Sequence, residues 1–374
     1  MTSEEVCENV RTVAAGFARD RAARQRRREL DPRDFEELAS AGFLRTGVGV
    51  ERGGLFESLP RSTRAIADIV RAIAHGDSSV ALVSSMHPAV TAFWLATPRA
   101  PEPHHERWMA QRLEVMELAS QGAWFGTITS EPGSGGDVSR TRATAQQSDG
   151  TWRLSGAKHF GSGSGVTSFM LTSAVPSGED APDWFFVDMR GVPWDGSAGV
   201  TLTAPWDGHG MIATQSHGLT FAAFPATRFA YPGNWKALSD AAAPLIGCVF
   251  TAVIVGIVET AMEYARERLA GKDFAAYERI EWTRAQIEAF TVAATYEHML
   301  RAVETSASPL HEVLLGKAAV AQLAESLTGR LCRIMGGGSY ARYSPFGFWF
   351  EDVRALGWLR PPWPLMFDAI FTTA

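Results

Sequence analysis

The sequence has few cysteines, and their arrangement suits neither a metal site nor a disulfide framework. Its 374 residues include only Cys7, Cys248 and Cys332, which stand far apart and form no CxxC or Cys/His ligand pattern. Such spacing is typical of free thiols in a reducing compartment. We therefore expect no metal centre and a cytoplasmic protein.

Positive charge is not in excess either. The chain has 35 Lys and Arg against 41 Asp and Glu, a formal charge of -6, which gives no overall attraction to nucleic acid. An arginine-rich stretch at 19–28 includes Asp20 and is followed by Glu29, a mixture that favours a solvent-facing helix surface over a phosphate-binding patch. The first residues lack the basic and then apolar pattern of a secretory signal, so we expect none.

Long apolar runs are scarce, and one stretch, Ala241–Val258, is uncharged over a length that could cross a membrane. Pro244, Gly247 and Gly256 interrupt it, and it continues directly into the amphipathic segment 259–268. This pattern favours a helix that is buried on all sides within a bundle. We therefore predict no membrane span.

The hydrophobic periodicity changes twice along the chain. Apolar residues recur at helical spacing in the first part, alternate at strand spacing between Gly and Asp turns in the middle, and return to helical spacing after Trp235. We predict an α+β protein with an N-terminal helical domain at 1–122, an antiparallel β-domain at 123–232, and a C-terminal four-helix bundle and tail at 233–374.

Two motifs in the middle region carry a specific resemblance. Thr129-Ser-Glu-Pro-Gly-Ser-Gly-Gly-Asp137 is followed by Leu154-Ser-Gly-Ala-Lys-His-Phe-Gly-Ser162. Together they resemble the signature of the acyl-CoA dehydrogenase superfamily, whose helical, β, helical order also matches. Two weaker matches are the segment 76–87, which resembles the helix lining that family's substrate cavity, and 333–340, which resembles its Gly-Gly turn.

The resemblance implies a flavin cofactor. We expect FAD, with FMN or reduced flavin as the alternatives. Ser130 would face the pyrimidine edge, Ser162 would lie near N5, and Phe160 would pack on the ring where the family usually has Trp. The glycine turn at 336–337 would meet the cofactor across a subunit boundary, which implies a homodimer or homotetramer. The cofactor-binding residues predicted in this way are Thr129, Ser130, Gly135, Gly136, Phe160, Ser162, Arg268, Gly336 and Gly337.

The catalytic base of the dehydrogenases is missing. Counting onward from Glu351-Asp352 places Arg360 where the family has its glutamate, and Pro361-Pro362 where it has Gly-Thr. The alternative position that some members use, near 244–247, also lacks an acid. Asp240 and Asp368 are the nearest candidates for a relocated base, although base placement is geometrically demanding.

These departures favour a two-component monooxygenase over a dehydrogenase. The family's contacts to the adenosine end are weakened, since Glu278 replaces a glutamine, which suits an enzyme that receives reduced flavin from a partner reductase. Its substrate would be hydrophobic or borne on a thioester, and the candidate catalytic residues are His87, Ser162 and His217. Two alternatives stay open: an acyl-CoA or acyl-carrier dehydrogenase or oxidase with a relocated base, and a non-catalytic flavin- or acyl-thioester-binding protein.

Overall fold

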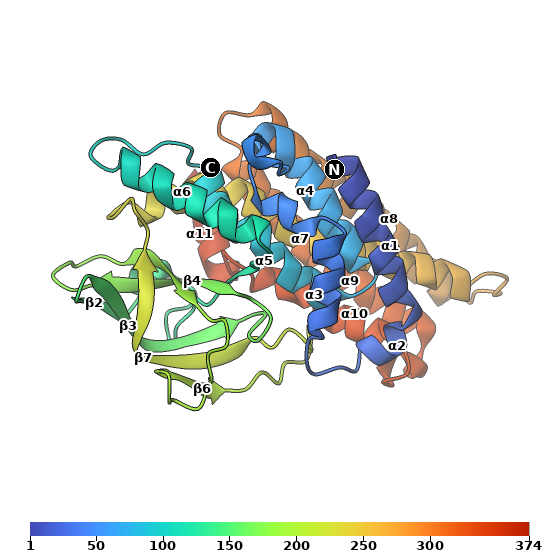
Figure 1. The fold of residues 1–374 in the computed structure, drawn as a ribbon. Helices are drawn as coiled ribbons and strands as arrows, with labels where there is room; N and C mark the ends of the chain where they lie inside the picture. The colour runs from blue at the N-terminus through green and yellow to red at the C-terminus, as the bar shows by residue number, and fades with distance from the viewer. Residues whose placement is uncertain (374) are drawn as a thin grey trace.

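Two helical regions flank a β-domain in the computed structural model, which describes residues 1–373 (Figure 1). This arrangement confirms the predicted fold class. Local signals explain where several helices begin: Thr2 and Glu5 form a capping box, and Asp31 caps a helix that starts with Pro32. The N-terminal helices are α1 (Ser3–Arg19), α2 (Arg21–Arg24), α3 (Pro32–Ser40), α4 (Leu59–Ala74), α5 (Ser78–Leu95) and α6 (His105–Ser120).

The middle region forms a closed, mostly antiparallel sheet. Strands β4, β2, β3, β7 and β5 pair in that order, and β5 pairs again with β4, while β1 and β6 attach to β4 and β7. Two pairings, β1 with β4 and β2 with β4, are parallel, which the strand pattern alone did not predict. The strands are β1 (Phe125–Thr127), β2 (Thr144–Ser148), β3 (Thr151–Gly161), β4 (Phe169–Pro176), β5 (Asp183–Asp188), β6 (Val200–Ala204) and β7 (His217–Arg228).

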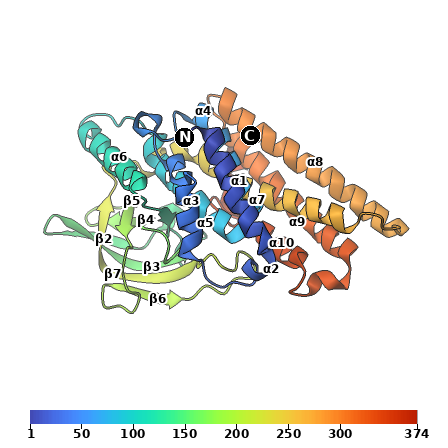
Figure 2. The same cartoon turned by 45° about the vertical axis from the view of Figure 1, so that its right-hand side comes forward.

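The C-terminal region has three long helices where four were expected. These are α7 (Trp235–Arg268), α8 (Ala276–Thr305) and α9 (Leu310–Met335), followed by the short α10 (Pro345–Val353) and α11 (Trp363–Thr373). Helix α4 from the N-terminal region packs against both α7 and α8 and completes the bundle (Figure 2). A short α10 forms because Pro345 starts a new helix after the turn that ends α9.

Within the described residues, α7 is the one helix that is long and apolar enough to cross a membrane. However, 83% of its most apolar 18-residue window is buried inside the protein. Its glycines permit close helix contacts: a Cβ on Gly256 would lie 2.7 Å from the carbonyl oxygen of Arg71 on α4, and one on Gly247 would lie 2.5 Å from Val313 on α9. The apolar composition of α7 therefore reflects its central place in the bundle.

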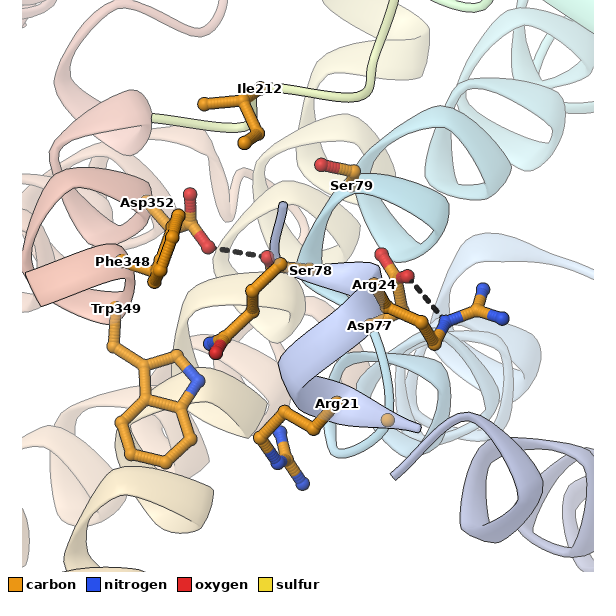
Figure 3. Close-up of a pocket in the computed structure, with 11 residues that line it drawn as sticks. Arg21, Arg24, Asp77, Ser78, Ser79, Ile212, Phe348, Trp349 and Asp352 are labelled. Carbon is orange, nitrogen blue, oxygen red and sulfur yellow. Dashed lines mark hydrogen bonds and ion pairs between the residues drawn. The ribbon is translucent and has the colours of Figure 1, made fainter. Parts of the chain in front are cut away.

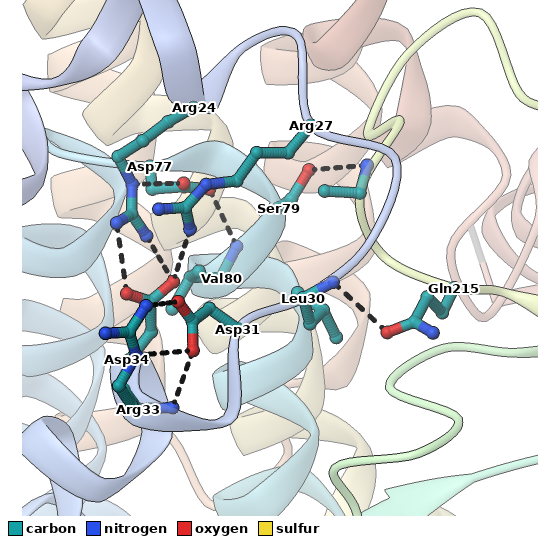
Figure 4. A network of polar contacts seen from close by, with 11 residues as sticks. Arg24, Arg27, Leu30, Asp31, Arg33, Asp34, Asp77, Ser79, Val80 and Gln215 are labelled. Carbon is teal, nitrogen blue, oxygen red and sulfur yellow. Dashed lines mark hydrogen bonds and ion pairs between the residues drawn. The ribbon is translucent and has the colours of Figure 1, made fainter.

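Part of the arginine-rich stretch is buried, contrary to the prediction of a solvated surface. Arg24 is 6% exposed and forms ion pairs with Asp34 at 2.6 Å and Asp77 at 2.7 Å, and Arg27 also reaches Asp34 at 2.9 Å (Figure 4). Asp77 in turn caps α5. The network joins the segment after α1 to α3 and α5, a long-range role that charge patterning within one helix does not reveal.

A second polar junction ties all three regions of the chain together. The buried carboxylate of Asp352 on α10 accepts a hydrogen bond from the Ser78 hydroxyl of α5 at 2.5 Å (Figure 3). It also accepts from the Met211 backbone amide of the β-domain at 2.6 Å. A cavity of about 20 Å³ lies beside these residues. Because Met211 lies in the loop between β6 and β7, this junction holds the loop on which the candidate site depends.

Candidate active site

The two middle-region motifs come together at an isolated β-bridge. Ser130 pairs with His159, whose amide donates to the Ser130 carbonyl oxygen at 2.8 Å. Behind this bridge the buried Lys158 ammonium donates to Glu131 at 2.6 Å. Glu131 also accepts from the backbone amides of Arg142 and Ala143. Glu131 and Lys158 are therefore buried structural residues that hold the two motifs together. The side chains next to them in the motifs face outward.

Phe160 lies outward on strained backbone. Its side chain is 59% exposed and its φ is +58°, at an irregularity in the pairing of β3 with β7. A bulky residue rarely adopts positive φ, and such strain concentrates at functional sites. An exposed ring held in this way suits stacking against a flat aromatic ligand.

Ser162 begins a chain of three buried hydroxyl groups. Its oxygen lies 2.8 Å from that of Ser216, which lies 2.7 Å from that of Thr214, and Thr214 donates to the Met211 carbonyl oxygen at 2.8 Å. A carbonyl can only accept, so it fixes the direction of the chain. Thr214 uses its proton on Met211, Ser216 donates to Thr214, and Ser162 donates to Ser216. Ser162 is thereby left with free lone pairs, ready to accept from a bound N–H group.

The glycine turn leaves room for a ligand. Gly135 and Gly136 have φ values of +65° and +81°, which favour glycine. Nothing lies within 4 Å of a Cβ built on Gly135, whereas one on Gly136 would lie 3.0 Å from Pro362 of the C-terminal segment. The turn is therefore open on one side and closed by the proline loop on the other, as a cradle for a flavin requires.

Arg268, Gly336 and Gly337 lie elsewhere, at the bundle end that carries α10. Arg268 is exposed at the end of α7 and donates to the Tyr264 hydroxyl at 2.9 Å. Gly336 and Gly337 follow α9, and a Cβ built on either would have no atom within 4 Å. Among the described residues no contact joins this group to Ser130, and the contact of the 336–337 turn with the cofactor of a second subunit stays a prediction.

His87 is fully buried, and both of its ring nitrogens are engaged. Nε2 donates to the Leu44 carbonyl oxygen at 3.0 Å, and Nδ1 accepts from the Phe125 amide at 3.3 Å. Burial lowers the pKa of His87 to about 4. Because no ring nitrogen is left for a substrate, we do not keep His87 in the proposed site: it joins α5 to β1, a role that its place on α5 did not reveal.

His217 lies close to the hydroxyl chain, since it directly follows Ser216 and pairs with Gly161 on β3. Its Nδ1 accepts from the Trp206 amide at 2.9 Å, and among the described residues no protein group bonds to Nε2. Burial lowers the pKa of His217, and the charge of Glu29 opposes this shift. The imidazole is therefore neutral near pH 7, with Nε2–H as its donor.

The residue at the position of the missing base is fixed in place by its neighbours. Nη2 of Arg360 donates to the Thr129 hydroxyl at 2.8 Å. Lys317 of α9 donates to the carbonyl oxygens on either side of it, at Leu359 (2.8 Å) and Pro361 (2.7 Å). From the sequence, Arg360 indicated only that the family's carboxylate is missing. Lys317 was not predicted, because a lone lysine within an apolar helix belongs to no motif.

Neither candidate for a relocated base lies in this site. Asp240 is exposed on α7 and forms an ion pair with Lys236 at 2.6 Å, and Asp368 is exposed on α11. Both carboxylates are therefore solvated surface groups in this structure.

Family comparisons agree with the two motifs. The sequence profile of the acyl-CoA dehydrogenase middle domain matches residues 126–224, and that of the acyl-CoA dehydrogenase C-terminal domain matches residues 240–360. The chain belongs to the acyl-CoA dehydrogenase superfamily. It is a flavin-dependent, acyl-CoA dehydrogenase-like oxidoreductase, and the open glycine turn, exposed Phe160 and oriented Ser162 fit a flavin.

The proteins similar to this chain include enzymes that are not named as dehydrogenases. The dibenzothiophene monooxygenase of Mycolicibacterium goodii is 28% identical over 62% of this chain, a match that spans 54% of that protein's length. The amino sugar nitrososynthase DnmZ of Streptomyces peucetius is 26% identical over 87% of this chain and 82% of its own. The solved structure of KijD3 in complex with FMN and a dTDP-linked sugar superposes with a TM-score of 0.82 at 19% identity, covering 99% of this chain and 93% of that one, which shows the shared fold.

Proposed function

We propose that this protein is a flavin-dependent monooxygenase that uses reduced flavin supplied by a partner reductase. The observation that carries the proposal is the orientation of the Ser162 hydroxyl, whose proton is committed to Ser216. Reduced flavin carries a proton at N5 and oxidised flavin does not, so a hydroxyl that can only accept favours the reduced form. When bound, reduced flavin supplies the two electrons that activate dioxygen.

The replacement of the catalytic glutamate supports the same reading. Removal of an α-proton by a dehydrogenase requires a carboxylate beside the thioester, and Arg360 occupies that position instead. Oxygen transfer does not require this base. The dibenzothiophene monooxygenase among the relatives acts by oxygenation, which is consistent with this proposal.

Within the site we assign separate roles to the chain's own residues. Ser130, Gly135 and Gly136 hold the pyrimidine side of the ring, Phe160 packs on it, and Ser162 accepts from N5–H. Nε2–H of His217 is the group that donates a hydrogen bond to the oxygen being transferred.

The cofactor is more readily FMN than FAD on this proposal. Glu278, which stands where the family has a glutamine near the cofactor's outer arm, is held by Lys272 at 2.8 Å and caps α8. A carboxylate there, unlike a glutamine amide, has no N–H to donate to the additional phosphate of FAD. We further propose a homodimer or homotetramer, since Arg268 and the 336–337 turn need a second subunit to reach a flavin.

Isotope labelling tests the activity. The protein, a flavin reductase, NADH and FMN are incubated with flat apolar compounds and acyl thioesters under labelled dioxygen, and products are analysed by mass spectrometry. We expect one labelled oxygen atom in the product. A new carbon–carbon double bond formed without dioxygen would overturn the proposal and return attention to a relocated base.

A further inference from the structure

Arg360 has unused hydrogen-bonding capacity beside the flavin motif. A guanidinium has five N–H donors, and among the described residues the one hydrogen bond that Arg360 makes is with the Thr129 hydroxyl. No Asp or Glu of the described chain lies within ion-pair distance of it, and Asp137 acts on it only through longer-range attraction. A half-buried arginine in this state is unusual, because desolvated charges are normally paired.

The surrounding charge does not compensate for this cation. The nearby Lys158 ammonium is also positive, and its carboxylate partner, Glu131, is already taken up by that lysine and by two backbone amides. Burial lowers the pKa of Arg360 to about 10, which leaves the group charged at neutral pH. The Arg360 guanidinium beside Thr129 therefore carries a positive charge that no neighbouring carboxylate neutralises.

The backbone that carries the Arg360 side chain is also held in place. Lys317 binds the carbonyl oxygens on both sides of Arg360, and the two prolines that follow restrict the backbone. Pro362 packs against Gly136, so the loop rests on the same glycine turn that would hold the flavin. A guanidinium on anchored backbone, bonded to Thr129 and with several free donors, matches a two-oxygen anion better than a lysine would.

We propose that Arg360 binds an oxyanion of the substrate, a carboxylate or sulfinate, and so orients its remaining part over the flavin. This inference rests on the proposed function and adds a substrate class to it: an anionic compound rather than a neutral apolar one. On this proposal, a single replacement at position 360 accounts for both features. The family's glutamate, which removes a proton, is absent, and Arg360, which binds an anion, stands in its place.

The test measures anion binding and flavin binding separately. Binding of benzoate, benzenesulfinate and the neutral analogue benzamide is measured by anaerobic calorimetry on the protein loaded with reduced FMN. We expect the anions to bind about tenfold or more tightly than benzamide, as charge-assisted hydrogen bonds imply. Arg360→Met should abolish that preference, while its affinity for reduced FMN stays within about threefold of the wild type.

Two further variants make the result interpretable. Arg360→Lys keeps the charge but loses the paired N–H donors of the guanidinium, so it should show an intermediate preference for the anions over benzamide. This variant also provides a test if Arg360→Met is misfolded. Arg99→Met removes an exposed arginine and should change nothing.

Each contrary outcome has a separate meaning. Equal binding of benzoate and benzamide by FMN-loaded wild type would contradict this inference and leave the proposed function intact. If Arg360→Met lost affinity for reduced FMN but kept the anion preference, the guanidinium would instead serve the flavin, and the inference would fail. Failure of the wild type to bind any flavin would contradict the inference and the proposed function together.

Discussion

Phe160 combines an exposed ring with an unfavourable backbone, and these two features predict opposite effects of one substitution. Phe160→Gly relieves the positive φ, which costs a non-glycine residue on the order of 1 kcal/mol, so the free energy of unfolding should not fall. Loss of the ring should weaken flavin binding about tenfold. Phe160→Trp, which introduces the family's usual residue and keeps an aromatic ring, should retain the wild-type affinity.

Thermal unfolding and flavin titration of these variants check the prediction. Phe160→Ala keeps the backbone strain and removes the ring, and is therefore the matched control for Phe160→Gly. Unchanged flavin affinity in both variants would show that the ring does not pack on the flavin.

Ser216 controls the direction of the hydroxyl chain and therefore the redox preference of the site. In Ser216→Ala the Ser162 proton is no longer committed, and the hydroxyl can donate to N5 of oxidised flavin. We expect the preference for reduced flavin to fall about fivefold to tenfold, chiefly through tighter binding of the oxidised form. Ser120→Ala, which removes a hydroxyl bound to Met116 within α6, is the control.

If Ser216→Ala instead weakened both flavin forms equally, the chain would have a packing role without directional character. Anaerobic titrations of each variant with oxidised and reduced FMN distinguish the two results.

At the scale of elements, Asp352 joins α10 to α5 and to the loop before β7, and it makes this junction sensitive to pH. Burial raises the pKa of Asp352 to about 6, opposed by the hydrogen bonds from Ser78 and Met211. The unfolded carboxyl titrates near its ordinary value of about 4. The protonated form favours the folded state, so this contribution to stability is complete below about pH 4 and is lost as the pH rises through about 6.

Asp352→Asn should remove this dependence, since the amide can accept from Met211 and donate to Ser78. The difference in unfolding free energy between variant and wild type should therefore grow in favour of the variant from about pH 4 to about pH 6. Asp31→Asn is a control of opposite sign, because hydrogen bonds from Arg33 lower the pKa of Asp31 to about 2. Its difference from the wild type should stay constant over that pH range, and the same flat result for Asp352→Asn would contradict the assignment.

Element order and motif position were predictable from the sequence because they depend on local pattern. Helical and strand periodicity gave the three regions, and the turn motifs predicted, through a family resemblance, that Ser130 and Ser162 serve one flavin site. Long-range partners were not predictable in this way. His87 lies on the expected helix but is bonded to Leu44 and Phe125, and Lys317 acts through carbonyls more than 40 residues away in sequence.

At the scale of the whole molecule, the two halves of the predicted flavin site lie at separate places on one chain. We expect that two subunits complete each site, with Arg268 and the 336–337 turn of one serving Phe160 of the other. Phe160→Ala and Arg268→Glu should each reduce flavin binding in homo-oligomers. Mixed oligomers, formed by refolding or coexpression, should recover binding at about half of their sites, because one of the two sites in a mixed pair is intact.

Flavin stoichiometry and analytical ultracentrifugation of purified mixed oligomers measure this recovery. The absence of any recovery in mixed oligomers would show that each site lies within one subunit. A monomer in solution would contradict the assembly directly.

The central claim is that the site is built for reduced flavin. It is tested most directly by anaerobic titration of the purified protein with oxidised and with reduced FMN and FAD, followed by absorbance and fluorescence. The account predicts that reduced flavin binds about tenfold or more tightly than oxidised flavin, because Ser162 can accept from N5–H but has no proton to donate. Equal or tighter binding of oxidised FAD would contradict it.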